Sequence, residues 1–270
     1  MIELRLLEQD KENNKVSFVL VNSTPSFANI LRRTIIEEVP VMAIEEVEFR
    51  KNNSILYDEM IAHRLGLLPL STDLKSYNLP SECKCEGKGC ARCQLKLTLK
   101  AKGPGIVYAS EMHTRDASVK PFFPKMPIVK LLKNQVLELE ATAVLGKGKE
   151  HVKWSAGHVY YKNKPLVEID MKKCDGCGKC IEQCPTKTLE IKDNKAAVSK
   201  DHLMDCHLCN ACIESCPKEA ITVTGTNDFI FTVESWGQLD CKAILIEASK
   251  LLNSKFDEFS EKLKEAKLSQ

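Results

Sequence analysis

The sequence lacks the features of a membrane-spanning, exported or nucleic-acid-binding chain. Its 270 residues contain no run of about 18 uncharged apolar residues, and the start alternates apolar and charged side chains, Ile2-Glu3-Leu4-Arg5. We therefore expect neither a membrane span nor a secretory leader, and we expect a cytoplasmic protein. The net charge is only +2, from 39 basic and 37 acidic residues, so nothing predicts that the chain holds nucleic acid by itself.

Sequence signatures of catalysis are also missing. We find no Walker phosphate loop, no Gly-x-Ser-x-Gly elbow and no catalytic carboxylate pair. His63 has no apparent acid–base partner, which favours a structural histidine. We therefore expect no intrinsic enzymatic activity.

The composition is otherwise that of a globular protein. Apolar residues make up 43% of the chain and charged residues 28%, which excludes a disordered or fibrous chain. The length predicts two domains with room for a small third.

Cysteine is the residue that is present in excess. There are 13 cysteines, and all except Cys241 fall into three tight clusters. Without an export signal we expect a reducing compartment, where disulfides are disfavoured and clustered thiolates usually hold metal. Cys241 lies on the apolar stripe of a predicted helix and is interpreted as a small core residue.

Two of these clusters form an internal repeat. Residues 174–191 and 206–223 both contain Cys-x2-Cys-x2-Cys-x3-Cys-Pro, which is the bacterial ferredoxin pattern. In that pattern three cysteines bind one [4Fe–4S] cluster and the fourth crosses to the other cluster. The predicted ligands are Cys174, Cys177, Cys180 and Cys216 for the first cluster, and Cys206, Cys209, Cys212 and Cys184 for the second. Zinc is the alternative, but tetrahedral zinc sites use pairs of ligands rather than triplets with a distant fourth.

The third cluster is more compact. Its four cysteines, Cys83, Cys85, Cys90 and Cys93, lie within eleven residues and predict a structural zinc site. The alternative is a site that is empty or partly degenerate, because one residue alone separates the first pair. Neither interpretation suggests catalysis, since four thiolates leave no open coordination position.

The remaining pattern predicts antiparallel strands and two amphipathic helices. Alternating apolar residues predict a hairpin over 2–20, strands over 95–101 and 137–143, and a further strand at 229–233. One helix runs from Pro25, with Thr24 as its N-cap, to about Val39. A closing helix extends from about residue 238 to residue 268, and its apolar stripe is long enough to suggest a partner surface. The alternative is that this helix merely covers its own sheet.

Two strings resemble a known family. They are SFANILRRTIIEEVPVMAIE at residues 26–45 and DEMIAHRLGLLPL at residues 58–70. With the cysteine loop at 83–93 and the closing helix, they resemble archaeal RNA polymerase D subunits, some of which carry a ferredoxin-like insertion. This resemblance implies an α+β fold. It also implies a dimerisation domain from residues 1–45 and 225–270, an inserted mainly β domain over 46–170, and a ferredoxin-like module over 171–224.

The resemblance further implies an assembly role. It predicts a heterodimer with subunit L, joined by subunit N, on which the large catalytic subunits assemble, with DNA contacted only through the holoenzyme. The interface residues that it implies are Phe27, Ile30, Leu31, Arg32, Arg33, Ile35, Leu245, Leu252, Phe256 and Phe259. The alternative for Arg32, Arg33 and Arg64 is a solvated face, whereas the family suggests contact with the large subunits.

Two functional hypotheses remain. The first is a non-catalytic assembly subunit whose iron–sulfur clusters are structural or redox-regulatory. The second is a ferredoxin-type electron-transfer subunit of an oxidoreductase, although the chain is much longer than a carrier needs and has no flavin or nicotinamide motif.

Overall fold

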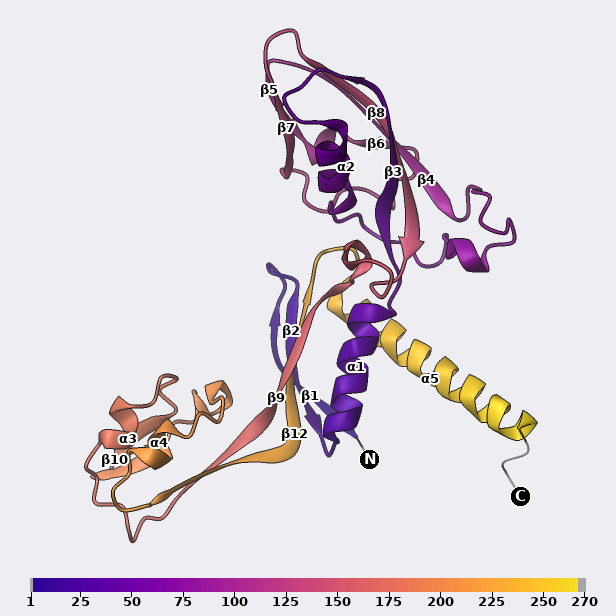
Figure 1. The fold of residues 1–270 in the computed structure, drawn as a ribbon. Coiled ribbons are helices and arrows are strands. Elements are labelled where there is room, and N and C mark those ends of the chain that lie inside the picture. Colours follow the sequence, from indigo (N-terminus) through magenta and orange to yellow (C-terminus); the bar gives the residue numbers. More distant parts are fainter. Residues whose placement is uncertain (1, 267–270) are drawn as a thin grey trace. The chain divides into compact units, whose positions relative to one another are not determined.

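The computed structural model describes residues 2–266, which fold into two compact units (Figure 1). The first unit comprises residues 2–9, 16–30 and 160–232, and the second comprises 10–15, 31–159 and 233–266. No helix in this part of the chain is long and apolar enough to cross a membrane.

The first unit is built on a four-stranded sheet with the order β1-β2-β12-β9. The predicted hairpin is confirmed as β1 (Glu3–Asp10) and β2 (Lys15–Val21). Aromatic side chains form the centre of the sheet, where the Phe231 ring stacks on Phe18 at 5.4 Å and on Tyr161 at 5.1 Å. Phe231 is fully buried, so this stack anchors the sheet.

The strands β9 (Gly157–Ile169) and β12 (Ile221–Ser235) also lead into and out of the cysteine repeat (Figure 1). The predicted strand at 229–233 is the end of β12. Its earlier part and the whole of β9 were not predicted, because they are mostly polar or exposed and show no sustained alternation of apolar residues.

Between these strands lies a small module of short elements. A compact core formed by Cys180, Leu189, Ala196 and Ile221 supports it. Its elements are α3 (Lys179–Glu182), β10 (Leu189–Lys192), β11 (Lys195–Val198), η4 (Leu203–Asp205) and α4 (Ala211–Glu214).

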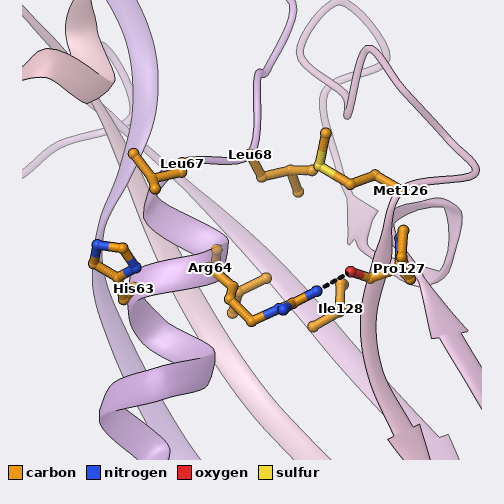
Figure 2. A pocket seen from close by; sticks show the side chains of 8 residues that line it. His63, Arg64, Leu67, Leu68, Met126, Pro127 and Ile128 are labelled. Carbon is orange, nitrogen blue, oxygen red and sulfur yellow. Dashed lines mark hydrogen bonds between the residues drawn. The ribbon is translucent and has the colours of Figure 1, made fainter.

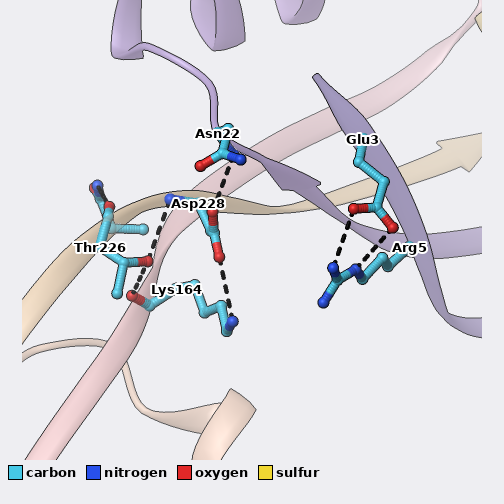
Figure 3. Close-up of polar contacts among 7 residues, drawn as sticks. Glu3, Arg5, Asn22, Lys164, Thr226 and Asp228 are labelled. Atoms are coloured by element: carbon cyan, nitrogen blue, oxygen red, sulfur yellow. Dashed lines mark hydrogen bonds and ion pairs between the residues drawn. The ribbon is translucent and has the colours of Figure 1, made fainter. Parts of the chain in front are cut away.

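Polar contacts around Asp228 tie the strands of the first unit together (Figure 3). One carboxylate oxygen accepts the N–H of Asn22 at 3.0 Å and the other accepts Lys164 Nζ at 3.2 Å. These contacts lower the pKa of Asp228, the Asn22 N–H most strongly. Thr226 Oγ1 accepts the Asp228 N–H and donates to the Lys164 carbonyl, so β12 is joined to β9 and to the residue after β2.

The second unit contains a four-stranded sheet with the order β3-β8-β4-β6. The strands predicted at 95–101 and 137–143 are confirmed as β4 and β8, which pair antiparallel with Leu97 opposite Ala141. The strands of this sheet are β3 (Val41–Asn52), β8 (Val136–Gly146), β4 (Gln94–Lys102) and β6 (His113–Thr114). A separate pair is formed by β5 (Gly105–Tyr108) and β7 (Pro127–Leu131).

A helix that the sequence analysis did not predict, α2 (Asp58–Gly66), contacts β3. Its residues Ile61 and Leu65 are fully buried in the core of this unit. The short helices η1 (Pro80–Glu82), η2 (Ala109–Glu111) and η3 (Val152–Trp154) complete the unit's connections.

The first predicted helix is confirmed as α1 (Pro25–Glu37). Thr24 Oγ1 accepts the Phe27 N–H at 3.2 Å, as expected of an N-cap. The helix ends two residues before the predicted limit, and Val39 lies buried beyond it.

The closing helix α5 (Cys241–Glu265) has buried positions in its first half and exposed residues in its second half. It is 25 residues, or about 38 Å, long and begins where Asp240 accepts the Ala243 N–H. Cys241 is buried, in agreement with its interpretation as a core residue, and Leu252 is the last buried position of the helix. Beyond it, Phe256 and Phe259 are 56% and 59% exposed. The predicted end at residue 268 lies outside the described residues.

We expect Phe231→Ala to destabilise the protein by about 3–5 kcal/mol, because it removes a fully buried ring that stacks on Phe18 and on Tyr161 and leaves a cavity there. Urea unfolding followed by circular dichroism measures the change. The control is Phe259→Ala, whose exposed ring predicts a change within about 0.5 kcal/mol. Equal effects of the two substitutions would contradict the assignment of the core.

Candidate metal centres

Four cysteines line one cavity of the module. They are Cys174, Cys177, Cys180 and Cys216, so the fourth cysteine of the second repeat lies with the triplet of the first. Ala196, Ala220 and Ile221 line the cavity beside them. The structure thus brings together the set that the spacing predicts for the first cluster.

Glycine allows the first loop to bend tightly. Gly176 and Gly178 have φ angles of 75° and 77°, a region that other residues adopt at a cost. A Cβ atom at Gly176 would lie 2.0 Å from the Asn194 carbonyl oxygen, so no larger residue fits there. The Asp175 carboxylate accepts the Cys177 N–H at 3.2 Å and fixes the same turn.

Backbone N–H groups point at several of the sulfurs. Ala196 N–H donates to Cys174 Sγ and Ala220 N–H donates to Cys216 Sγ, each at 3.4 Å. In the other half of the repeat, Thr188 N–H donates to Cys184 Sγ at 3.3 Å. Such bonds favour a thiolate and tune the potential of an iron–sulfur cluster.

The thiols of the second set influence one another. Burial, and after it the charge of Cys184 from the other repeat, raises the pKa of Cys212 to about 11. Cys206 and Cys209 act on Cys212 in the same direction. Burial likewise raises the pKa of Cys180, and the charges of Cys216, Cys174 and Cys177, which line the same cavity, act in the same direction.

The spacing of the sulfurs separates two kinds of site. Among residues 2–266, one group of sulfurs is close enough to share a single ion: Cys83, Cys85, Cys90 and Cys93, all within 4.8 Å of one another. In the module, four cysteines instead line a common cavity. A four-iron cube, which occupies the space between its ligands, fits that arrangement better than a single zinc ion does.

The loop at 83–93 has the dimensions of a zinc site. Zinc–sulfur bonds of about 2.3 Å in a tetrahedron place the sulfurs about 3.8 Å apart. The observed separations are 3.6 Å for Cys83–Cys90, 3.5 Å for Cys85–Cys93 and 3.8 Å for Cys90–Cys93. The residues therefore fit a closed four-thiolate zinc centre.

The pKa values of these thiols are shifted in opposite directions. Hydrogen bonds from Cys83 and Cys93 lower the pKa of Cys85 to about 6. Burial raises the pKa of Cys93 to about 12. A bound cation would favour the thiolate form of all four residues.

The residues implied as an interface divide by exposure. Those that are buried within the chain are Leu31, Ile35 and Leu252, and those that are half-buried are Phe27, Arg32 and Leu245. The exposed ones are Ile30, Arg33, Phe256 and Phe259, of which Arg33 pairs with Glu37 at 3.0 Å. A partner can therefore reach only part of the predicted stripe directly.

Arg64 lines a pocket beside α2 (Figure 2). Its guanidinium donates to the Pro127 carbonyl at 2.7 Å and so joins α2 to the start of β7. Met126 and Ile128 also line this pocket, and no sequence pattern predicted their approach to α2. His63 is exposed at the pocket instead of packed in the core, so burial gives no support to its interpretation as a structural histidine.

Comparison with known proteins identifies two regions of the chain. Residues 47–159 match the RNA polymerase Rpb3/RpoA insert domain, and residues 166–228 match a 4Fe–4S dicluster domain.

Relatives cover nearly the whole chain, and each of the following is named DNA-directed RNA polymerase subunit Rpo3. The protein of Archaeoglobus fulgidus is 42% identical over 98% of this chain and 99% of its own length. That of Methanosarcina acetivorans is 40% identical over 95% and 96%, respectively. That of Pyrococcus horikoshii is 36% identical over 97% and 98%.

We expect about one zinc ion per chain in the loop at 83–93, and Cys85→Ser to reduce the zinc content to near zero, because it removes one of four ligands. Elemental analysis of the purified protein measures the zinc. Cys241→Ser, which changes a buried cysteine outside the three clusters, should leave zinc unchanged. Zinc retained in Cys85→Ser would contradict this site.

Proposed function

The chain belongs to the Rpo3 family of DNA-directed RNA polymerase subunits, and from this membership we propose that it is a non-catalytic assembly subunit that pairs with subunit L. It is an archaeal RNA polymerase subunit with an iron–sulfur domain. The heterodimer, joined by subunit N, would form the platform for the two large catalytic subunits, and DNA would be contacted only through the holoenzyme.

The observation that carries this proposal is the unpartnered end of α5. Beyond Leu252, the apolar stripe continues with Phe256, Phe259 and Leu263, which are exposed. Most of the other residues in this part of α5 are charged or polar. Exposed apolar side chains that recur every three or four residues along a helix are typical of a protein interaction site. A second amphipathic helix that covered them would complete the stripe.

The iron–sulfur domain would hold two [4Fe–4S] clusters. We assign Cys174, Cys177, Cys180 and Cys216 to one cluster and Cys206, Cys209, Cys212 and Cys184 to the other. The shared cavity of the first set and the mutual influence of the thiols in the second support this assignment. The chain's residues supply thiolates and N–H donors, and a bound cluster would add either cross-linking of the module or a reversible electron site.

We favour a structural role for these clusters. The core of the module has only four buried residues, Cys180, Leu189, Ala196 and Ile221, against which partly buried aliphatic residues and further cysteines pack, so metal coordination would supply much of its stability. An electron-transfer subunit is the less favoured function, because the relatives that match the chain along its length are polymerase subunits.

We expect Phe256→Asp with Phe259→Asp to weaken binding of subunit L by at least about tenfold, because each substitution places a charge in an apolar interface. Analytical ultracentrifugation of the two purified subunits measures the affinity. Ile106→Asp, a change of similar exposure on β5, is the control and should leave binding unchanged. Unaltered binding by the double variant would exclude this surface as the interface.

We expect Cys177→Ser with Cys209→Ser to lower the yield of assembled polymerase, because the first substitution removes a ligand of one cluster and the second a ligand of the other. Iron, sulfide and holoenzyme yield should be measured after anaerobic purification, with Cys241→Ser as the control. A yield that stays unchanged both anaerobically and in air would contradict a stabilising role.

A further inference from the structure

One side chain of the sheet reaches the second cysteine loop. Lys162, on β9, donates from Nζ to the carbonyl oxygen of Cys206 at 3.2 Å. Cys206 opens the loop of residues 206–212, which carries three of the ligands assigned to the second cluster. The contact joins residues 44 positions apart, both of which belong to the first unit.

The second loop needs an external restraint more than the first. The two loops correspond residue by residue, yet Gly176 and Gly178 of the first are replaced by Leu208 and Asn210 in the second. Leu208 and Asn210 have φ angles of 60° and 64°, close to the values of the two glycines. A side chain makes this left-handed conformation costly, most of all for leucine, so the surroundings must hold the loop in it.

The positive charge of Lys162 would stabilise the second cluster in addition to the hydrogen bond. A [4Fe–4S] cluster with four thiolate ligands is an anionic centre, and the Lys162 ammonium lies against the backbone of one of its ligand residues. On the same face of β9, Lys164 is directed to Asp228 instead (Figure 3). Two neighbouring lysines of one strand therefore have different contacts.

We propose that Lys162 is a positioning residue that fixes the second cysteine loop on β9, so that retention of the second cluster depends on this contact and retention of the first does not. The inference rests on the proposed pair of clusters. It makes the second cluster the one that is coupled to the sheet.

The experiment compares Lys162→Met with the unchanged chain, each purified anaerobically with subunit L and then exposed to EDTA and iodoacetamide. Cys177 and Cys209 occupy the same position in the two repeats and are both exposed, so their alkylation rates report separately on the two clusters. We expect alkylation of Cys209 to be about tenfold faster in Lys162→Met, from the loss of one charged hydrogen bond, and alkylation of Cys177 to be unchanged. Peptide mass spectrometry resolves the two sites.

Three further variants define the cause. Lys164→Met removes an equal charge from the same strand and should change neither rate more than about twofold. Lys162→Arg preserves a donor and should restore slow alkylation of Cys209. Leu208→Gly relieves the left-handed leucine and should slow alkylation of Cys209 below that of the unchanged chain.

The outcomes separate this inference from the proposed function. Equal acceleration at both cysteines, or none at Cys209, would overturn the role of Lys162. If Lys162→Met takes up no iron at all, retention of the first cluster also depends on Lys162, and that role would be overturned as well. About four iron atoms per unchanged chain, in place of about eight, would instead overturn the assignment of two clusters.

Discussion

Two neighbouring strands have two roles on which the first unit depends. They belong to its sheet, and they also connect that sheet to the iron–sulfur module. The strands β9 and β12 pair beside β2, and their far ends enter and leave the cysteine repeat (Figure 1). Because the strands are hydrogen-bonded neighbours, a whole module can lie between them without interrupting the order of the sheet. The contacts of Asp228 and the stack on Phe231 join β12 to β9 before the two strands reach the module.

Thiolate chemistry is used in two geometries within the chain. In the loop at 83–93 the sulfurs lie 3.5–3.8 Å apart where they touch, which is the spacing of ligands around one small ion. In the module Cys174, Cys177, Cys180 and Cys216 instead line a cavity, so the second repeat contributes its fourth cysteine to the triplet of the first. With the converse crossing that we propose for Cys184, each half of the repeat would depend on the other. A module with so small an apolar core gains most from ligands that are far apart in sequence, since these close the longest loops.

The sequence predicted the features that are encoded locally. The cysteine spacing identified the three clusters, alternation identified β1, β4 and β8, and Thr24-Pro25 identified the start of α1. It did not predict β9, in which polar and apolar residues of mixed exposure follow one another without a sustained alternation. The helix α2 was also missed, since only Ile61 and Leu65 of its nine residues are buried and they leave little periodic signal. The contacts of Arg64 with Pro127 and of Lys162 with Cys206 join residues that only the tertiary fold brings together.

The burial of α5 shows why its stripe was ambiguous from sequence. A continuous series of apolar residues every three or four positions gives no sign of where the covering surface changes, because a core and an interface select the same side chains. In the structure the chain itself covers the stripe as far as Leu252 and leaves Phe256 and Phe259 exposed. The buried part and the exposed part are therefore successive lengths of one helix, so the two alternatives need not compete. In the proposed assembly subunit, the buried half would fix the direction of the helix, and the exposed half could then meet a partner without first having to fold.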